Sequence, residues 1–194
     1  MVYLFLADGF EEIEALGTID ILRRCGLMVQ TLSVTGKRVV SSARGLEVKA
    51  DSVFRKNHLV NCEALVIPGG LKGTESMMKN AVLRQAIASQ YNQGACIAAI
   101  CAGPMVLYSA NILQFKHFTM YPGLQENMEK VFYHNEAFVV VHDNIITGCG
   151  PAATHLFAVT LARHLVNDLA IVDQVEREMC FTGYDPSMHC VLTI

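Results

Sequence analysis

Residues 94–113, GACIAAICAGPMVLYSANIL, contain no charged side chain and decide which fold class the chain belongs to. Their length matches that of a membrane-spanning helix. The pair Gly103-Pro104 interrupts the run, however, and polar side chains follow it. A buried strand up to residue 100 and a helix from Pro104 to residue 113 fit better, because proline suits the first turn of a helix. The stretch therefore predicts a strand–turn–helix unit in a protein with no membrane span.

The same alternation continues on both sides of this stretch. Apolar runs predict strands, helical spacing predicts helices, and turn residues separate them. The expected strands are 2–7, 28–34, 64–67, 95–100 and 118–120, with hairpins at 39–42/46–50 and 137–141/145–147; the expected helices are 13–24, one ending before Gly94, 104–113, 151–165 and 169–179. This order predicts a single domain over 1–194, an α/β three-layer sandwich whose mostly parallel sheet has helices on both faces.

Composition excludes several classes of partner. The 15 basic and 18 acidic residues give a net charge of −3 without like-charge runs, so we expect no nucleic-acid or membrane binding. A hydrophobic fraction of 52% agrees with a parallel sheet covered on both faces. The seven cysteines form no C-x-x-C pair, which argues against a metal site. With no basic leader before the first strand, we expect a cytoplasmic protein with reduced thiols.

Three segments follow the expected parallel strands where ligands bind in open α/β sheets. They are residues 8–14, 68–73 and 101–104. The carboxyl ends of parallel strands lie at one edge of a sheet, so these segments should meet in space. The sequence therefore predicts a site at that edge.

Cys101 is the candidate nucleophile of this site. It lies at a strand-to-helix turn, the position of a nucleophile elbow, where backbone N–H groups favour a thiolate and lower the pKa from about 8.5. The alternative is simple packing, because free cysteines are often buried. Both interpretations stay open at this point. The other six cysteines are expected to serve packing or to lie at the surface, and no histidine can be paired with Cys101 from the sequence.

Acidic and glycine residues complete the candidate site. Glu11 and Glu12 are expected on the solvated first turn of a helix. A partly buried Glu14 would have a raised pKa and could donate a hydrogen bond to a thiolate. In the Pro-Gly-Gly turn at 68–70, the amide of Gly70 could form an oxyanion hole with that of Ala102; the alternative is an ordinary strand-ending turn.

Four motifs in order, ADGFEEIEA (7–15), ALVIPGGLKGTE (64–75), AAICAGP (98–104) and GCGPAATHLFAVTL (148–161), resemble the ThiJ/PfpI superfamily. Within it, they are similar to the branch of the parkinsonism-associated protein deglycase and its bacterial homologues. The resemblance implies a flavodoxin-like fold and a homodimer, without metal or organic cofactor. It implies that Cys101 is the nucleophile, Glu14 its hydrogen-bonded glutamate, and the Gly70 and Ala102 amides the oxyanion hole. The implied pocket or dimer rim consists of Gly69, Arg44, Tyr121, Gly150 and Pro151.

The resemblance also implies the chemistry. The expected function is a cysteine-dependent glyoxalase or deglycase acting on reactive aldehydes or glycated proteins. The alternative is a non-enzymatic redox sensor in which Cys101 is oxidised to sulfinate. A cysteine peptidase is the third possibility, but PfpI-like proteases carry histidine where this chain has Ala102. Tyr121 replaces a histidine of several members, and tyrosine is a poor proton acceptor near neutral pH, which argues against strong glyoxalase activity.

Overall fold

In the computed structural model, which describes residues 1–181 and 191–194, a sheet of eight strands divides the molecule. Its order is β12-β10-β11-β7-β6-β1-β2-β5. The parallel part consists of β11 (Ile145–Gly148), β7 (Cys96–Ile100), β6 (Ala64–Ile67), β1 (Val2–Leu6), β2 (Val29–Ser33) and β5 (Ser52–Val53); β10 (Val139–His142) is antiparallel to β11, and β12 (Val191–Thr193) is parallel to β10. The central strands are continuously apolar because both of their faces are covered.

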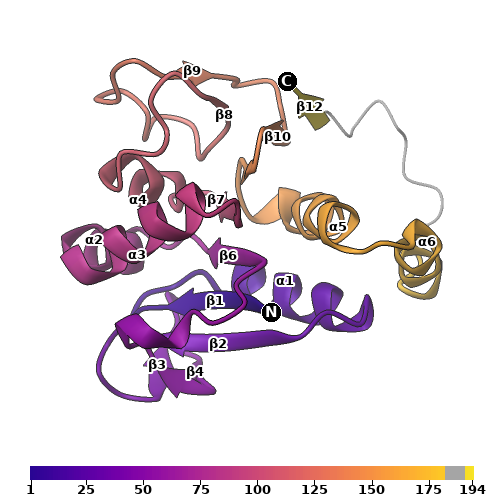
Figure 1. Ribbon diagram of the computed structural model, residues 1–194, viewed down its shortest axis with the longest axis horizontal. Helices are drawn as coiled ribbons and strands as arrows, with labels where there is room; N and C mark the ends of the chain where they lie inside the picture. The colour runs from indigo at the N-terminus through magenta and orange to yellow at the C-terminus, as the bar shows by residue number, and fades with distance from the viewer. Residues whose placement is uncertain (182–190) are drawn as a thin grey trace.

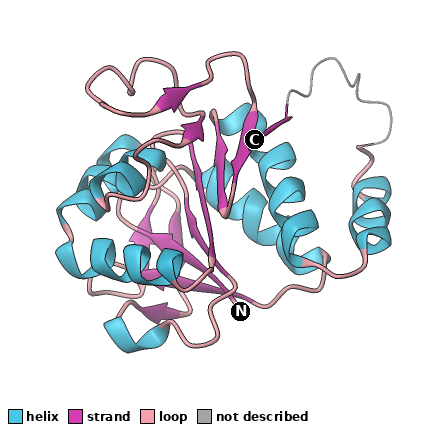
Figure 2. Ribbon diagram, turned by 45° about the horizontal axis from the view of Figure 1, so that its top comes forward, coloured by secondary structure: helices cyan, strands magenta, loops and turns pink. Residues whose placement is uncertain are grey.

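Helices cover the two faces of the sheet, which confirms the predicted three-layer α/β sandwich (Figures 1 and 2). One side carries α1 (Glu12–Arg24), α5 (Thr154–Leu165) and α6 (Leu169–Glu178). The other carries α2 (Leu71–Lys79), α3 (Ala81–Asn92) and α4 (Pro104–Ser109). Short 3-10 helices are η1 (Lys56–His58) and η2 (Pro151–Ala153).

Some predicted elements differ from those observed. The sequence predicts one helix before Gly94, but two are present, and Asn80 separates them by capping α3 through the N–H of Leu83 (3.1 Å). The predicted hairpin is formed by β3 (Val39–Ser41) and β4 (Glu47–Lys49). The strand expected at 118–120 is β8 (His117–Phe118), which pairs with β9 (Phe132–Tyr133) outside the main sheet.

The burial of α1 is the opposite of what its sequence predicts at the first turn. Ile13 and Leu16 are 58% and 39% exposed, whereas Glu11 and Glu12 are buried. The expectation of solvated Glu11 and Glu12 is therefore wrong. The reason is tertiary: Glu11 caps the helix by accepting the N–H of Glu14 (2.8 Å), and Arg44 from a distant loop covers both carboxylates.

Within residues 1–181 and 191–194, no helix has both the length and the hydrophobicity needed to cross a membrane. The same residues contain no group of three or more histidine, cysteine or acidic side chains arranged to hold a metal ion.

Candidate functional site

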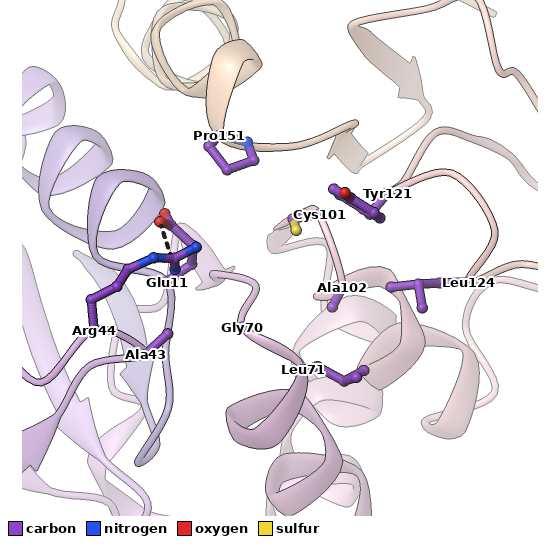
Figure 3. Close-up of a pocket in the computed structure, with 10 residues that line it drawn as sticks. All are labelled: Glu11, Ala43, Arg44, Gly70, Leu71, Cys101, Ala102, Tyr121, Leu124 and Pro151. Atoms are coloured by element: carbon purple, nitrogen blue, oxygen red, sulfur yellow. Dashed lines mark hydrogen bonds and ion pairs between the residues drawn. The ribbon is translucent and has the colours of Figure 1, made fainter.

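A cavity of about 520 Å³ opens beyond the carboxyl ends of β1, β6 and β7 (Figure 3). The three segments predicted to converge do meet there. The cavity is lined by Glu11, Ala43, Arg44, Gly70, Leu71, Cys101, Ala102, Tyr121, Leu124 and Pro151. The sequence reasoning missed Glu11, Ala43, Leu71 and Leu124 as lining residues. Two of these had a usable signal, because Leu71 directly follows the Pro-Gly-Gly turn and Ala43 directly precedes Arg44.

Cys101 lies at the base of this cavity in a strained turn. Its φ of +62° falls in the left-handed region, which non-glycine residues seldom adopt. Two backbone hydrogen bonds hold the turn: the Cys101 N–H donates to Gly148 O (2.8 Å), and its carbonyl accepts the N–H of Tyr121 (3.0 Å). The backbone N–H groups of Ala102 and Gly70 lie close enough to the Cys101 sulfur to lower the pKa of its thiol. The strand-to-helix turn predicted at this residue is therefore present, and it directs the thiol into the cavity.

Glu14 reaches the sulfur from α1 across Gly69. The Glu14 side chain is fully buried, and its Oε2 accepts the N–H of Gly69 at 2.7 Å. A methyl group placed on Gly69 would lie 2.6 Å from Glu14 Oε2 and 2.9 Å from Cys101 Sγ. The carboxylate oxygen and the sulfur therefore both lie close to the same point beside Gly69. Oε1 makes no hydrogen bond of standard length to any described residue. The interaction between the Glu14 carboxyl and the Cys101 thiol shifts the pKa of both groups.

Burial raises the pKa of both Glu14 and Cys101, and Glu14 raises that of Cys101 further, whereas the Cys101 thiol lowers that of Glu14. Burial raises the pKa of Glu14 to about 7, against the hydrogen bonds from Gly69 and Cys101. Burial also raises the pKa of Cys101 to about 12, and the Glu14 carboxylate adds to this, while the amides of Ala102 and Gly70 oppose it. The sequence-based expectation of a lowered Cys101 pKa is therefore wrong while Glu14 is ionised. A thiolate forms when its proton passes to the neighbouring carboxylate.

Replacing Glu14 with glutamine should stabilise the protein at alkaline pH. The folded pKa of about 7 exceeds the ordinary value of 4.5, so the folded state binds more protons between these values. The contribution of Glu14 to the free energy of unfolding is therefore highest below pH 4.5 and falls as the pH rises to 7. Removing this ionisation should add about 3 kcal/mol at pH 8 and under about 1 kcal/mol at pH 5.

Urea unfolding of wild type and Glu14→Gln at both pH values measures this difference. Asp20→Asn is the matched control, because Asp20 lies on the exposed side of α1, where it pairs with Arg24. A Glu14→Gln effect that is equal at both pH values contradicts the assigned pKa.

Charged groups form one wall of the cavity. Arg44 Nη1 lies 3.4 Å from Glu11 Oε1 and 3.7 Å from Glu12 Oε2, and the Arg44 side chain is 68% exposed (Figure 3). Buried carboxylates thus hold an exposed guanidinium at the cavity mouth. Arg44 comes from the same chain as Cys101.

Tyr121 and Pro151 form the opposite wall, above Cys101 (Figure 3). Gly150 stands behind them: a methyl group added there would lie 3.6 Å from the Tyr121 ring. Among the residues that the structure describes, no histidine lines the cavity. His134 pairs instead with Glu136 (3.2 Å) and with His117 (2.7 Å), away from this wall.

The other cysteines differ from Cys101 in setting. Cys25 and Cys96 are buried, Cys62 and Cys149 are half-buried, and Cys180 is exposed, as expected for packing or surface positions. Cys190 lies outside the described residues.

Comparisons with known proteins agree with this fold. The sequence pattern of the DJ-1/PfpI family matches residues 1–164. The chain is 31% identical to protein dj-1beta of Drosophila melanogaster over 163 residues, covering 84% of this chain and 87% of that protein. It is 30% identical to the glutathione-independent glyoxalase DJR-1.2 of Caenorhabditis elegans, covering 81% and 84%. The crystal structure of Drosophila melanogaster DJ-1beta superposes with a TM-score of 0.88 at 29% identity, covering 94% of this chain and 98% of that one. With a flavodoxin-like α/β fold, a buried glutamate beside an elbow cysteine and these similarities, the chain belongs to the DJ-1/PfpI family.

Proposed function

We propose that this protein converts small α-oxoaldehydes such as methylglyoxal into hydroxy acids, with Cys101 as nucleophile and Glu14 as proton carrier. The observation that carries the proposal is the buried Glu14 carboxyl beside the Cys101 sulfur, with a pKa of about 7. A group with this pKa both accepts and donates protons at neutral pH. The glyoxalase name of the nematode relative supports the same reaction class.

The first step is addition of sulfur to the aldehyde carbon. Because the pKa of Cys101 is raised to about 12, the thiol must lose its proton as it attacks, and Glu14 is the base placed to take it. A carbon–sulfur bond forms and the carbonyl becomes an oxyanion. The N–H groups of Gly70 and Ala102, which lie beside the sulfur, stabilise that oxygen.

The second step moves hydrogen between the two carbons of the substrate. Protonated Glu14 first neutralises the oxyanion, giving a hemithioacetal. Its carboxylate then removes the proton from the carbon bonded to sulfur, and an enediol forms. Return of a proton to the adjacent carbon yields a thioester, which water hydrolyses to lactate and free Cys101. The sum is one methylglyoxal plus one water giving one lactic acid, with no external oxidant or reductant.

The cavity admits more than methylglyoxal. Its volume of about 520 Å³ far exceeds that of a five-heavy-atom substrate, and its mouth is open beside Arg44. A second hollow of about 340 Å³ shares Ala43 and Leu71 with it. We therefore extend the proposal to aldehyde adducts on protein side chains, the deglycase reaction.

Formation of lactate tests the proposed reaction. Purified protein is incubated with methylglyoxal in deuterated water, and the product is followed by NMR. Lactate should appear, with deuterium at the carbon that receives its proton from Glu14 to the extent that Glu14 exchanges with solvent. Absence of lactate above the protein-free rate contradicts the proposal.

A redox function is the second candidate, favoured by the same pair of groups. Oxidation of Cys101 by peroxide gives sulfenate and then sulfinate. Protonated Glu14 would stabilise the sulfinate by donating a hydrogen bond. The peptidase alternative has no comparable support, because Ala102 stands where PfpI-like proteases carry histidine and none of the described lining residues is a histidine.

We also propose that the protein is a homodimer that covers the exposed apolar side of α1. Ile13 and Leu16 are 58% and 39% exposed there. Ile13→Glu should reduce the mass measured by light scattering from that of two copies to that of one. Val82→Glu is the matched control, since Val82 is 48% exposed on α3 of the opposite layer. Equal masses for wild type and Ile13→Glu contradict this interface.

A further inference from the structure

Cys149 lies beside Cys101 on the neighbouring strand. Strands β7 and β11 are parallel, and their last registered pair is Ile100 with Gly148. The next residue of each strand is a cysteine. The Cys101 N–H donates to the carbonyl oxygen of Gly148 at 2.8 Å, and that carbonyl belongs to the peptide bond leading into Cys149.

This hydrogen bond limits how far apart the two cysteines can be. With standard peptide dimensions, a 2.8 Å bond from the Cys101 nitrogen to the Gly148 oxygen keeps the two Cα atoms within about 7 Å. Disulfides join Cα atoms about 4.4–6.8 Å apart. The backbone of this strand end therefore keeps the Cα atoms of Cys101 and Cys149 at about the separation that a disulfide can span.

The environment of Cys149 agrees with this placement. Its side chain is half-buried and packs against the same hydrophobic cluster that contains Cys101. The Glu14 carboxylate raises the pKa of both thiols, so Glu14 is near each of them. Cys96 offers a contrast, because it begins the strand that Cys101 follows, roughly 16 Å away along β7.

We propose that Cys149 is a resolving cysteine that converts peroxide-oxidised Cys101 into a reversible disulfide. Cys101 sulfur attacks hydrogen peroxide as its proton passes to Glu14. The O–O bond breaks, Cys101 becomes a sulfenic acid, and the departing hydroxide takes the proton as water. Cys149 sulfur then attacks the Cys101 sulfur, the S–O bond breaks, and the Cys149 proton leaves with that hydroxide as a second water. Two thiols and one peroxide give one disulfide and two waters.

This inference shares with the redox candidate only the reactivity of Cys101 toward peroxide, and it does not depend on aldehyde turnover. It adds a second possible fate for the sulfenic acid of Cys101. The sulfenic acid of Cys101 either reacts with Cys149 and is recovered by thiols, or reacts with more peroxide and becomes sulfinate. The Cys149 thiol therefore determines whether the disulfide or the sulfinate forms.

Mass spectrometry after brief, near-stoichiometric peroxide tests the proposal. Wild type should lose two hydrogen atoms, and its tryptic peptides 85–116 and 131–163 should be linked through Cys101 and Cys149. Because peptide 85–116 also contains Cys96, fragmentation assigns the linked sulfur. Dithiothreitol should restore the original mass. This arm uses the unmodified protein and does not depend on the folding of any variant.

The variant Cys149→Ser should instead gain two oxygens on Cys101, and dithiothreitol should not remove them. Its sulfinate should form at least tenfold faster than that of wild type. Cys62→Ser is the matched control and should form the disulfide normally. Sulfinate on wild-type Cys101 with Cys149 free overturns the resolving role but leaves the redox candidate intact. No oxidation of Cys101 overturns both.

Discussion

Replacing Cys101 with serine is expected to lower kcat/KM for methylglyoxal by about a thousandfold or more. Serine has nearly the same shape, so the turn and the cavity should persist. The hydroxyl, however, holds its proton far more tightly than a thiol, and Glu14, with a pKa of about 7, is too weak a base to remove it. Nucleophilic attack therefore fails although the substrate can still enter.

Lactate formation by wild type and Cys101→Ser, compared at equal protein concentration, measures this effect. Cys62→Ser serves as the matched control, because Cys62 lies just before β6, at the opposite end of that strand from the cavity. Circular dichroism and thermal unfolding should show both variants folded. Turnover by Cys101→Ser within tenfold of wild type would remove Cys101 from the mechanism.

Replacing Gly69 with alanine is expected to disrupt the site from a position that bears no reactive group. The added methyl would lie 2.6 Å from Cys101 Cβ, 2.6 Å from Glu14 Oε2 and 2.9 Å from Cys101 Sγ. These distances are below van der Waals contact, and neither neighbour is a free, exposed side chain. One of them must move, which should destabilise the protein by about 1–3 kcal/mol and lower turnover about a hundredfold or more.

A control variant is needed to distinguish an effect on stability from an effect on the spacing of Cys101 and Glu14. Gly36 has a φ of +85° with nothing within 4 Å of an added methyl, so Gly36→Ala should cost about 1–2 kcal/mol through backbone strain alone. It should keep full turnover, because Gly36 lies outside the cavity lining. Thermal unfolding and lactate formation are measured for both variants. If Gly69→Ala turns over methylglyoxal as wild type does, the Cys101–Glu14 spacing does not control the reaction.

Both predictions rest on a pair of groups that share one proton. At alkaline pH, Glu14 is ionised and raises the pKa of Cys101, so the thiol keeps its proton. Below pH 7 Glu14 is protonated, and it can act only as a donor. In a site of this kind, the thiol loses its proton to the carboxylate only as the sulfur attacks the substrate or the oxidant. No thiolate has to be present beforehand.

Much of the fold could be predicted from local sequence patterns. The apolar runs of β1, β6 and β7 and the helical spacing of α5 are each local signals, and their alternation predicts a layered α/β sandwich. The break at Gly103-Pro104 predicted the turn that holds Cys101. The split between α2 and α3 was missed, because a single polar residue, Asn80, interrupts an otherwise helical segment.

Burial at the first turn of α1 could not be predicted in the same way. Glu11 and Glu12 resemble the solvated acidic residues that commonly begin helices, and Ile13 resembles a core residue. Their real environments are set by Arg44, which is remote in sequence, and by the direction in which α1 packs on the sheet. Side-chain identity alone carries no information about such contacts.

The sequence by itself determined the layered fold and the residues that gather at the strand ends, because hydrophobic periodicity and turn chemistry are properties of short segments. It also identified Cys101 and Glu14 as partners through the motifs that contain them. Only the tertiary structure decided the direction of the Cys101 pKa, the need for glycine at position 69 and the hydrogen bond that brings the peptide group before Cys149 next to Cys101. These properties depend on desolvation, steric contact and strand pairing between segments that are distant in the chain. No local pattern specifies them, since they arise only when α1, β6, β7 and β11 pack together.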